Sequence, residues 1–121
     1  MSELAVNGCT VKITSGQSAV SIQITTPPSN DCAVGGKGIY FGDIDVLLTT
    51  ITQGNLLCAS GTITISGTAD NILNADGDKA VQKGDNATKS LTFTDQSSGA
   101  QTPIDVKIEI TDAGQTDVSA T

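Results

Sequence analysis

The sequence contains no histidine and very few aromatic residues. Aromatics make up 2% of its 121 residues, namely Tyr40, Phe41 and Phe93, and tryptophan is absent. Histidine is the usual general base near neutral pH, so its absence disfavours catalysis and we expect no enzymatic activity. Aromatic side chains normally supply much of a domain's buried area. The core of this chain must therefore be built from Val, Ile, Leu and Ala.

Basic residues are scarce as well. The chain has 6 Lys+Arg against 13 Asp+Glu, which gives a formal net charge of −7. A nucleic-acid-binding protein needs a clustered basic face that neutralises phosphates, so we expect no nucleic-acid partner. The same negative charge disfavours stable docking on anionic lipid.

Long apolar runs are also missing. Residues 1–7 have neither a basic start nor an apolar stretch of signal-peptide length. No apolar run approaches the roughly 18 to 20 residues of a membrane-spanning helix. We therefore expect the chain to be synthesised as a soluble cytoplasmic product.

What the sequence does contain is apolar and polar residues alternating with a period of two. Short segments rich in Thr, Ile and Val are separated by Gly, Pro, Asn and Asp; they are residues 10–14, 19–25, 38–43, 44–51, 61–67, 90–94 and 103–111. This pattern predicts short β-strands joined by turns. Only residues 69–75 could form a helical turn. The sequence thus predicts one small all-β domain.

An imperfect internal repeat accompanies these strands. Each half runs from a cysteine through a strand, a Gly-rich turn and a second strand to a Gly-Asp pair: from Cys9 to Gly42-Asp43, and from Cys58 to Gly84-Asp85. A Gly-Asp pair by itself is an ordinary turn dipeptide. Its recurrence after matching strands favours stacked β-units that share a continuous core.

The three cysteines, Cys9, Cys32 and Cys58, allow two interpretations. A cytoplasmic origin and an odd number disfavour disulfides, and no CxxC spacing marks a zinc site. The thiols can be small buried hydrophobic groups. Alternatively, all three converge on one metal ion, for which thiolates favour zinc first and iron second, with a fourth ligand still required.

Acidic residues gather between Asp70 and Asp78, which raises the question of a calcium site. The segment lacks the ligand spacing and the terminal Glu of an EF-hand loop. We interpret these carboxylates as solvated turn residues.

Three stretches resemble the PAAR-repeat and PAAR-like proteins that tip the spikes of type VI secretion systems and related contractile phage tails. They are Gly8-Cys9, Cys58–Ile63 and Asn74–Asp85, and residues 36–43 look like a first copy of the last stretch. In the family, a Gly-bounded strand precedes a turn in which Gly-Lys is followed by a short strand and Gly-Asp. The resemblance covers roughly residues 4–90.

This resemblance implies a small conical PAAR-like β-fold of short strands over residues 1–90, with residues 91–121 as a C-terminal β extension of the same domain. The broad base would sit on a trimeric β-helical spike protein, and a metal would pin the apex. The family's usual ligands are three histidines and one cysteine. This chain has no histidine, so the carry-over offers Cys9, Cys32 and Cys58 as ligands of one zinc, with iron as the second choice and no fourth ligand assigned.

The function implied by the resemblance is mechanical. The protein would be made in the bacterial cytoplasm, assembled into an injection particle and delivered or released outside the cell. It would sharpen the spike, contact the target membrane transiently and offer a place to attach effector cargo. The alternative function is a β-sandwich decoration or adhesin-like module of a virion or cell surface, which predicts ordinary buried thiols and no stoichiometric metal.

Overall fold

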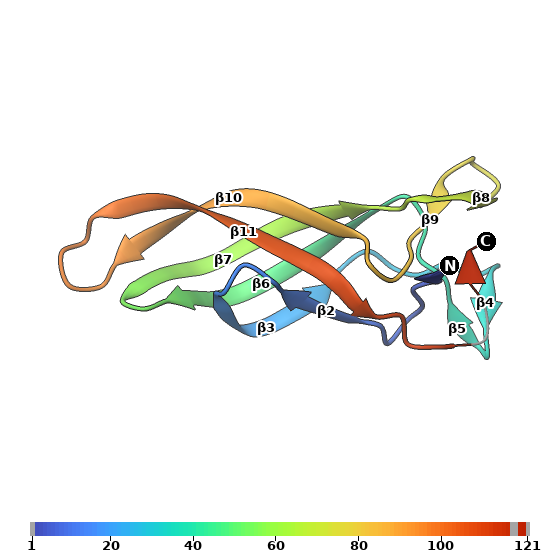
Figure 1. The fold of residues 1–121 in the computed structure, drawn as a ribbon, viewed down its shortest axis with the longest axis horizontal. Helices are drawn as coiled ribbons and strands as arrows, with labels where there is room; N and C mark the ends of the chain where they lie inside the picture. Colours follow the sequence, from blue (N-terminus) through green and yellow to red (C-terminus); the bar gives the residue numbers. More distant parts are fainter. Residues whose placement is uncertain (1, 117–118, 121) are drawn as a thin grey trace.

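The computed structural model describes residues 2–116 and 119–120, which form β-strands joined by turns (Figure 1). The strands are β1 (Ser2–Glu3), β2 (Thr10–Ile13), β3 (Ser18–Ile24), β4 (Ala33–Val34), β5 (Lys37–Gly38), β6 (Asp43–Gln53), β7 (Leu56–Ser66), β8 (Ala69–Leu73), β9 (Lys79–Ala80), β10 (Asn86–Asp95), β11 (Gln101–Asp112) and β12 (Ser119–Ala120). The all-β prediction is confirmed. No helix in this part of the chain has the length and hydropathy that a membrane span requires.

The longest strands form one antiparallel sheet of six strands in the order β2-β11-β10-β7-β6-β3. β6 pairs with β7 from Asp43 opposite Ser66 to Gln53 opposite Leu56. β10 pairs with β11 along most of its length. The two edge strands, β2 and β3, follow each other in the chain and lie close together. The sheet therefore curls into a nearly closed barrel, and we call the gap between β2 and β3 the seam.

The interior of the barrel is filled mostly by aliphatic side chains, as the composition predicted. Phe93 is the one fully buried phenylalanine among the residues described, at 0% exposure. Around it pack Val11, Ile44, Val46, Leu48, Ile51, Ile63, Ile65, Leu91, Val106, Ile108 and Ile110. Burying each such side chain contributes about 1.5–3 kcal/mol, so this cluster supplies most of the stabilisation of the fold.

β7 and β10 begin several residues earlier than the alternating pattern predicted, whereas β6 covers nearly the predicted residues 44–51. In β6, the core-facing positions Ile44, Val46 and Leu48 are followed by Ile51, so the alternation changes phase by one residue. Thr50 lies between them with a φ of 50°, a left-handed conformation that is unusual for a β-branched residue. The kink lets Ile51 face the core although it lies three residues after Leu48.

The chain is built from three similar units. Each unit consists of a short strand, two barrel strands and a second short strand: β1, β2, β3, β4; then β5, β6, β7, β8; then β9, β10, β11, β12. Short strands join neighbouring units, because β4 pairs with β5, β8 with β9 and β12 with β1. In the barrel, β6 pairs with β3, β10 with β7 and β2 with β11. The fold therefore has pseudo-threefold symmetry.

One segment of each unit contributes to a closed cycle of backbone hydrogen bonds. Ala5 N donates to Val81 O (2.8 Å), Val81 N donates to Tyr40 O (2.9 Å) and Tyr40 N donates to Ala5 O (3.1 Å). A second set obeys the same symmetry two residues to either side: Asn7 N to Gly38 O, Gly42 N to Lys79 O and Lys83 N to Glu3 O. We call residues 4–6, 39–41 and 80–82 the strand ring.

The strand ring separates two apolar clusters. Its central residues, Ala5, Tyr40 and Val81, pack into the barrel core. The residues that flank them pack with Ala69 in a second cluster beneath the short sheets; these are Leu4, Val6, Ile39 and Ala80, with Phe41 at the margin. The ring thus closes one end of the barrel.

The body is elongated and narrows towards the β10–β11 turn (Figure 1). The broad end carries the three short sheets and both ends of the chain, whereas the narrow end carries the turns of the long hairpins. We refer to these as the broad end and the narrow end.

The repeat is threefold, whereas the sequence suggested two copies. Cys9 precedes β2 and Cys58 lies inside β7, so the two cysteines that were matched are not equivalent. The Gly-Asp pairs do mark equivalent points, because Gly42-Asp43 lies at the start of β6 and Gly84-Asp85 directly before β10. Residue 90 lies within β10, and β11 is an interior strand of the sheet. Residues 91–112 are therefore an integral part of the barrel.

Candidate functional site

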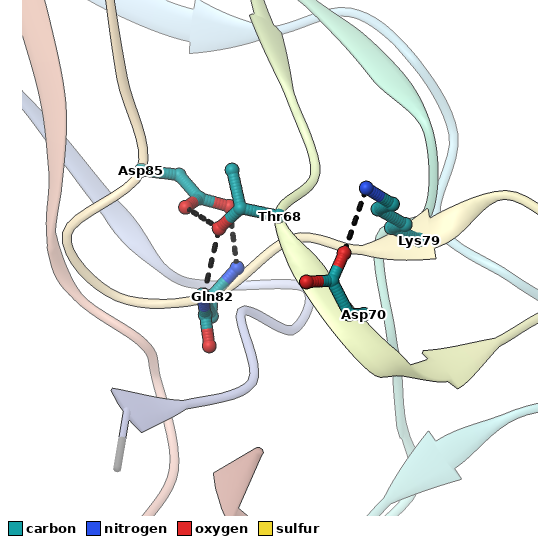
Figure 2. A network of polar contacts seen from close by, with 5 residues as sticks. All are labelled: Thr68, Asp70, Lys79, Gln82 and Asp85. Carbon is teal, nitrogen blue, oxygen red and sulfur yellow. Dashed lines mark hydrogen bonds and ion pairs between the residues drawn. The ribbon is translucent and has the colours of Figure 1, made fainter. Parts of the chain in front are cut away.

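A polar network holds the Gly-Asp turn of the third unit (Figure 2). The Asp85 carboxylate, 6% exposed, accepts a hydrogen bond from Gln82 N (2.9 Å) and another from the Thr68 hydroxyl. The Gln82 side-chain amide donates to the same hydroxyl oxygen (2.7 Å). Gly84 has a φ of +96°, which lets Asp85 N donate to Gln82 O (3.1 Å). This network fixes the direction in which the chain leaves the strand ring and enters β10.

The first unit contains the same turn with a cysteine in place of the aspartate. Cys9 N donates to Val6 O (2.9 Å), and Gly8 has a φ of +97°. Cys9 therefore occupies the position equivalent to Asp85. In the second unit the turn is one residue shorter, with Gly42 directly before Asp43. A glycine that follows each ring segment, at positions 8, 42 and 84, is the sequence signal by which the threefold repeat could have been found.

The Cys9 thiol is poorly suited to nucleophilic chemistry. Burial raises its pKa from 9.0 to about 11, a backbone hydrogen bond lowers it in part, and the charge of Asp112 raises it further. A reactive cysteine needs the opposite shift, because the thiolate is the nucleophile. The side chain packs against the barrel core as a small apolar group.

The other two cysteines lie elsewhere in the molecule. Cys58 is buried in the barrel core opposite Ile51, near the narrow end, and its thiol donates to Ser60 O (3.3 Å). Cys32 packs against the second apolar cluster at the broad end, where its backbone N donates to the Ser29 hydroxyl oxygen (3.1 Å). All three cysteines are free thiols.

The strand register shows how far apart these thiols are. Thr10, next to Cys9, pairs with Asp112 at the end of β11, and Leu57, next to Cys58, pairs with Thr94 at the level where β11 begins. β11 has 12 residues, so Cys9 and Cys58 are separated by a distance on the order of 30 Å. Ligands of one zinc ion place their sulfur atoms within about 4 Å of one another, since each Zn–S bond is about 2.3 Å.

The three thiols therefore do not fit a single metal ion. Across residues 2–116 and 119–120, no group of three or more His, Cys, Asp or Glu side chains is arranged to hold a metal. The structure does not bring together the ligand set that the resemblance offered, because the strand register places Cys9 beside the end of β11 and Cys58 at the level of its beginning.

The acidic segment forms the turn of the β8–β9 hairpin. The Asn74 side-chain oxygen accepts from Asp76 N (3.0 Å) and Asp78 N (2.9 Å). Asp70 pairs with Lys79 at 2.7 Å, and both side chains are largely exposed. An exposed ion pair stabilises a protein by at most about 1 kcal/mol. These contacts agree with the interpretation of the segment as a solvated turn.

Comparison of the chain with family models, with curated proteins and with solved structures found no match. The arrangement of the broad end therefore carries the functional argument.

Three two-stranded sheets, one at each junction between units, surround the strand ring at the broad end. A two-stranded sheet is only marginally stable by itself, so each depends on the ring and on the apolar cluster beneath it. The β8–β9 hairpin adds the exposed side chain of Leu73 (52%) and the acidic turn. This end presents three similar elements around one axis, which is an arrangement suited to a threefold partner.

Proposed function

We propose that the chain is a non-catalytic spike-tip protein that caps a trimeric β-helical spike in a contractile injection system or a phage-tail-like particle. The observation that carries this proposal is the strand ring, in which Ala5, Tyr40 and Val81 are related by a pseudo-threefold axis. The sequence resemblance to PAAR-like proteins points to the same kind of assembly.

The threefold repeat favours a trimeric partner. A homotrimeric shaft ends in three identical surfaces arranged around its axis. A single chain with three similar units can contact all three surfaces at once, and each contact after the first is effectively intramolecular. A chain without this repeat would engage one spike subunit differently from the other two. One copy of the protein per three spike chains is the stoichiometry that follows.

The broad end is the better candidate for attachment. Its three two-stranded sheets lie at equivalent junctions between the units, although β8 has 5 residues whereas β4 and β12 have 2. The barrel strands are not equivalent in length, since β2 has 4 residues whereas β6 has 11 and β10 has 10. The narrow end therefore has no threefold face, and its projecting β10–β11 hairpin points away from the shaft in this orientation (Figure 1).

The proposal does not require a metal. In a spike tip with a bound metal, the ion would join strands that a small apolar core is unable to hold together. Here the strand ring and the clusters on both sides of it already join the three units. Rigidity of the tip is therefore attributed to hydrogen bonds and apolar packing.

Native mass spectrometry with a truncated trimeric β-helical spike protein from a contractile system tests the proposal. We expect a complex of one chain with three spike chains. Ala75→Trp, in the β8–β9 turn at the broad end, should weaken the complex, whereas the matched change Ser98→Trp, in the β10–β11 turn at the narrow end, should not; both positions are exposed. Failure to bind the spikes of contractile systems, or a stoichiometry other than one to three, would contradict the proposal.

The placement of the thiols favours a second candidate, the decoration or adhesin-like module. That function predicts cysteines that serve as core groups, and Cys58 is one, at 7% exposure. It predicts that the chain forms no complex with any trimeric spike and that it attaches to a virion or cell surface. The spike-binding experiment therefore separates the two functions.

A further inference from the structure

The pseudo-threefold symmetry leaves one ladder of the barrel incomplete. In the second unit, β6 and β7 form a ladder that extends from Asp43 to Gln53, and in the third unit β10 and β11 pair from Asn86 to Thr94. The equivalent strands of the first unit, β2 and β3, lie at opposite edges of the sheet order and form no such ladder, although all of their residues are described. β3 therefore pairs with β6 along one side and has an open edge along the other.

The seam is fixed at the β2–β3 turn by side chains. Gln17, 7% exposed, donates to the Gln53 side-chain oxygen (2.7 Å) and accepts from the Ser15 hydroxyl. The Ser15 oxygen accepts from Lys107 N (2.9 Å). This chain of contacts links β11 to β6 across the turn. Beyond the turn β2 has only 4 residues, too few to cover the 7 residues of β3.

The edge of β3 lacks two features that usually protect an open strand, charged residues and proline. Residues 18–24 contain no charged residue and no proline, in a chain whose net charge is −7. Val20 is 78% exposed, and it and Leu73 are the two large apolar side chains that stand out into solvent among the described residues. On the inner side, Ile22 and Ile24 are only partly covered by the core.

We propose that β3 takes an extended segment of a partner protein as an added antiparallel strand. The two equivalent positions in this same molecule indicate the occupant, because each is filled by an antiparallel strand in regular register. Backbone hydrogen bonds provide the affinity in this mode, and side chains at alternate positions provide specificity. The segment carries apolar residues at the positions that cover Val20 on one face and Ile22 and Ile24 on the other.

Charge restricts the partner further. The protein carries −7 overall and β3 is neutral, so an acidic segment is repelled by the rest of the molecule and a neutral or basic segment is not. A second copy of this chain also has a net charge of −7, so electrostatic repulsion disfavours it as the occupant. The inference concerns a surface remote from the strand ring and does not rest on the spike-tip function.

A probe with suitable chemistry exists within the sequence. β10 is the counterpart of β2, and it pairs with β11, the counterpart of β3. A capped peptide with the sequence of residues 86–94 is uncharged except for one lysine. We would titrate this peptide into the full chain, labelled with ¹⁵N, up to millimolar concentration. The control peptide has proline in place of the leucine that corresponds to Leu91.

The expected result is saturable shifts of the amide signals of residues 18–24, with slower amide hydrogen exchange in the same residues. The control peptide should produce neither. Val20→Lys should abolish the response, because a lysine on an edge strand disfavours strand addition. Thr92→Lys places the same charge on the exposed face of an interior strand and should leave the response unchanged.

The proposal would be overturned by the absence of a saturable shift, by shifts that map to another surface, or by a response that Val20→Lys leaves intact. Shifts in β3 that depend on protein concentration without any peptide would identify a second copy of the chain as the occupant, and would also overturn the assignment to a partner protein.

Discussion

Removing the Asp85 carboxylate tests whether the polar network of the third unit stabilises the fold. Asp85→Ala deletes the acceptor for both Gln82 N and the Thr68 hydroxyl. A buried donor left without a partner costs about 1–3 kcal/mol. Gln82 N lies in a partly buried turn, so leaving it without an acceptor should account for most of this cost. The Thr68 hydroxyl can rotate and donate to water instead. The expected loss is about 2–3 kcal/mol in the free energy of unfolding.

The assay is urea unfolding followed by circular dichroism, with thermal melting as a second measurement. A loss of 2–3 kcal/mol corresponds to a fall in Tm of roughly 10 °C for a domain of this size. Asp85→Asn keeps one carbonyl oxygen as acceptor and should lose about half as much. Asp76→Ala, on the exposed β8–β9 turn, is the matched control and should stay within about 0.5 kcal/mol of the unmodified protein. An Asp85→Ala variant as stable as this control would refute the reasoning.

Three further predictions concern backbone strain, close packing and ionisation. Thr50→Gly should raise the free energy of unfolding by about 1 kcal/mol in urea unfolding, because glycine adopts a φ of 50° freely. The control Thr52→Gly should lower the free energy of unfolding by a similar amount. If both variants changed it in the same direction, strain at Thr50 would be contradicted. Gly67→Ala would place a methyl group 2.2 Å from a backbone oxygen of β9 and should prevent stable folding. Gly61→Ala would place its methyl group 2.8 Å from the movable side chain of Leu91, so thermal melts should show a much smaller fall in Tm for this variant. With its pKa raised by burial from 9.0 to about 11, Cys9 should react with iodoacetamide far more slowly in the folded chain than in the unfolded chain at pH 8, as measured by mass spectrometry. The protonated thiol's contribution to the free energy of unfolding is complete below pH 9 and should be lost as the pH rises from 9 to 11. If the difference in the free energy of unfolding between the unmodified protein and Cys9→Ala did not change over this pH range, the prediction would be wrong.

The local pattern of the sequence predicts the strands because alternation reports which face of a strand is buried. Residues 10–14, 19–25 and 61–67 all fall in or beside observed strands. The pattern placed the start of β7 at residue 61, five residues too late, because Ala59 and Ser60 are both exposed and break the alternation. It predicted a strand over residues 38–43, which contains one ring segment, but not the segments 4–6 and 80–82 that pair with it, because three residues are too few to show a period.

The candidate metal site illustrates the same limit. The composition shows that three thiols are present and that thiols can bind a metal. It does not show how far apart the three thiols lie in the fold. Cys9 and Cys58 each lie beside turn residues in the sequence, yet β11 places their neighbours at its two ends. Distance between residues on different strands depends on register, which is a property of pairing partners far away in the chain.

The sequence by itself determined the class of the fold and the nature of its core. With 2% aromatics, many Thr, Ile and Val residues at alternate positions and frequent Gly, the chain has to fold as strands over an aliphatic interior. The tertiary structure decided the threefold repeat, the separation of the thiols and the open edge of β3. The physical reason is that a strand satisfies its backbone hydrogen bonds with another segment, so its partner is chosen only when the whole chain is assembled.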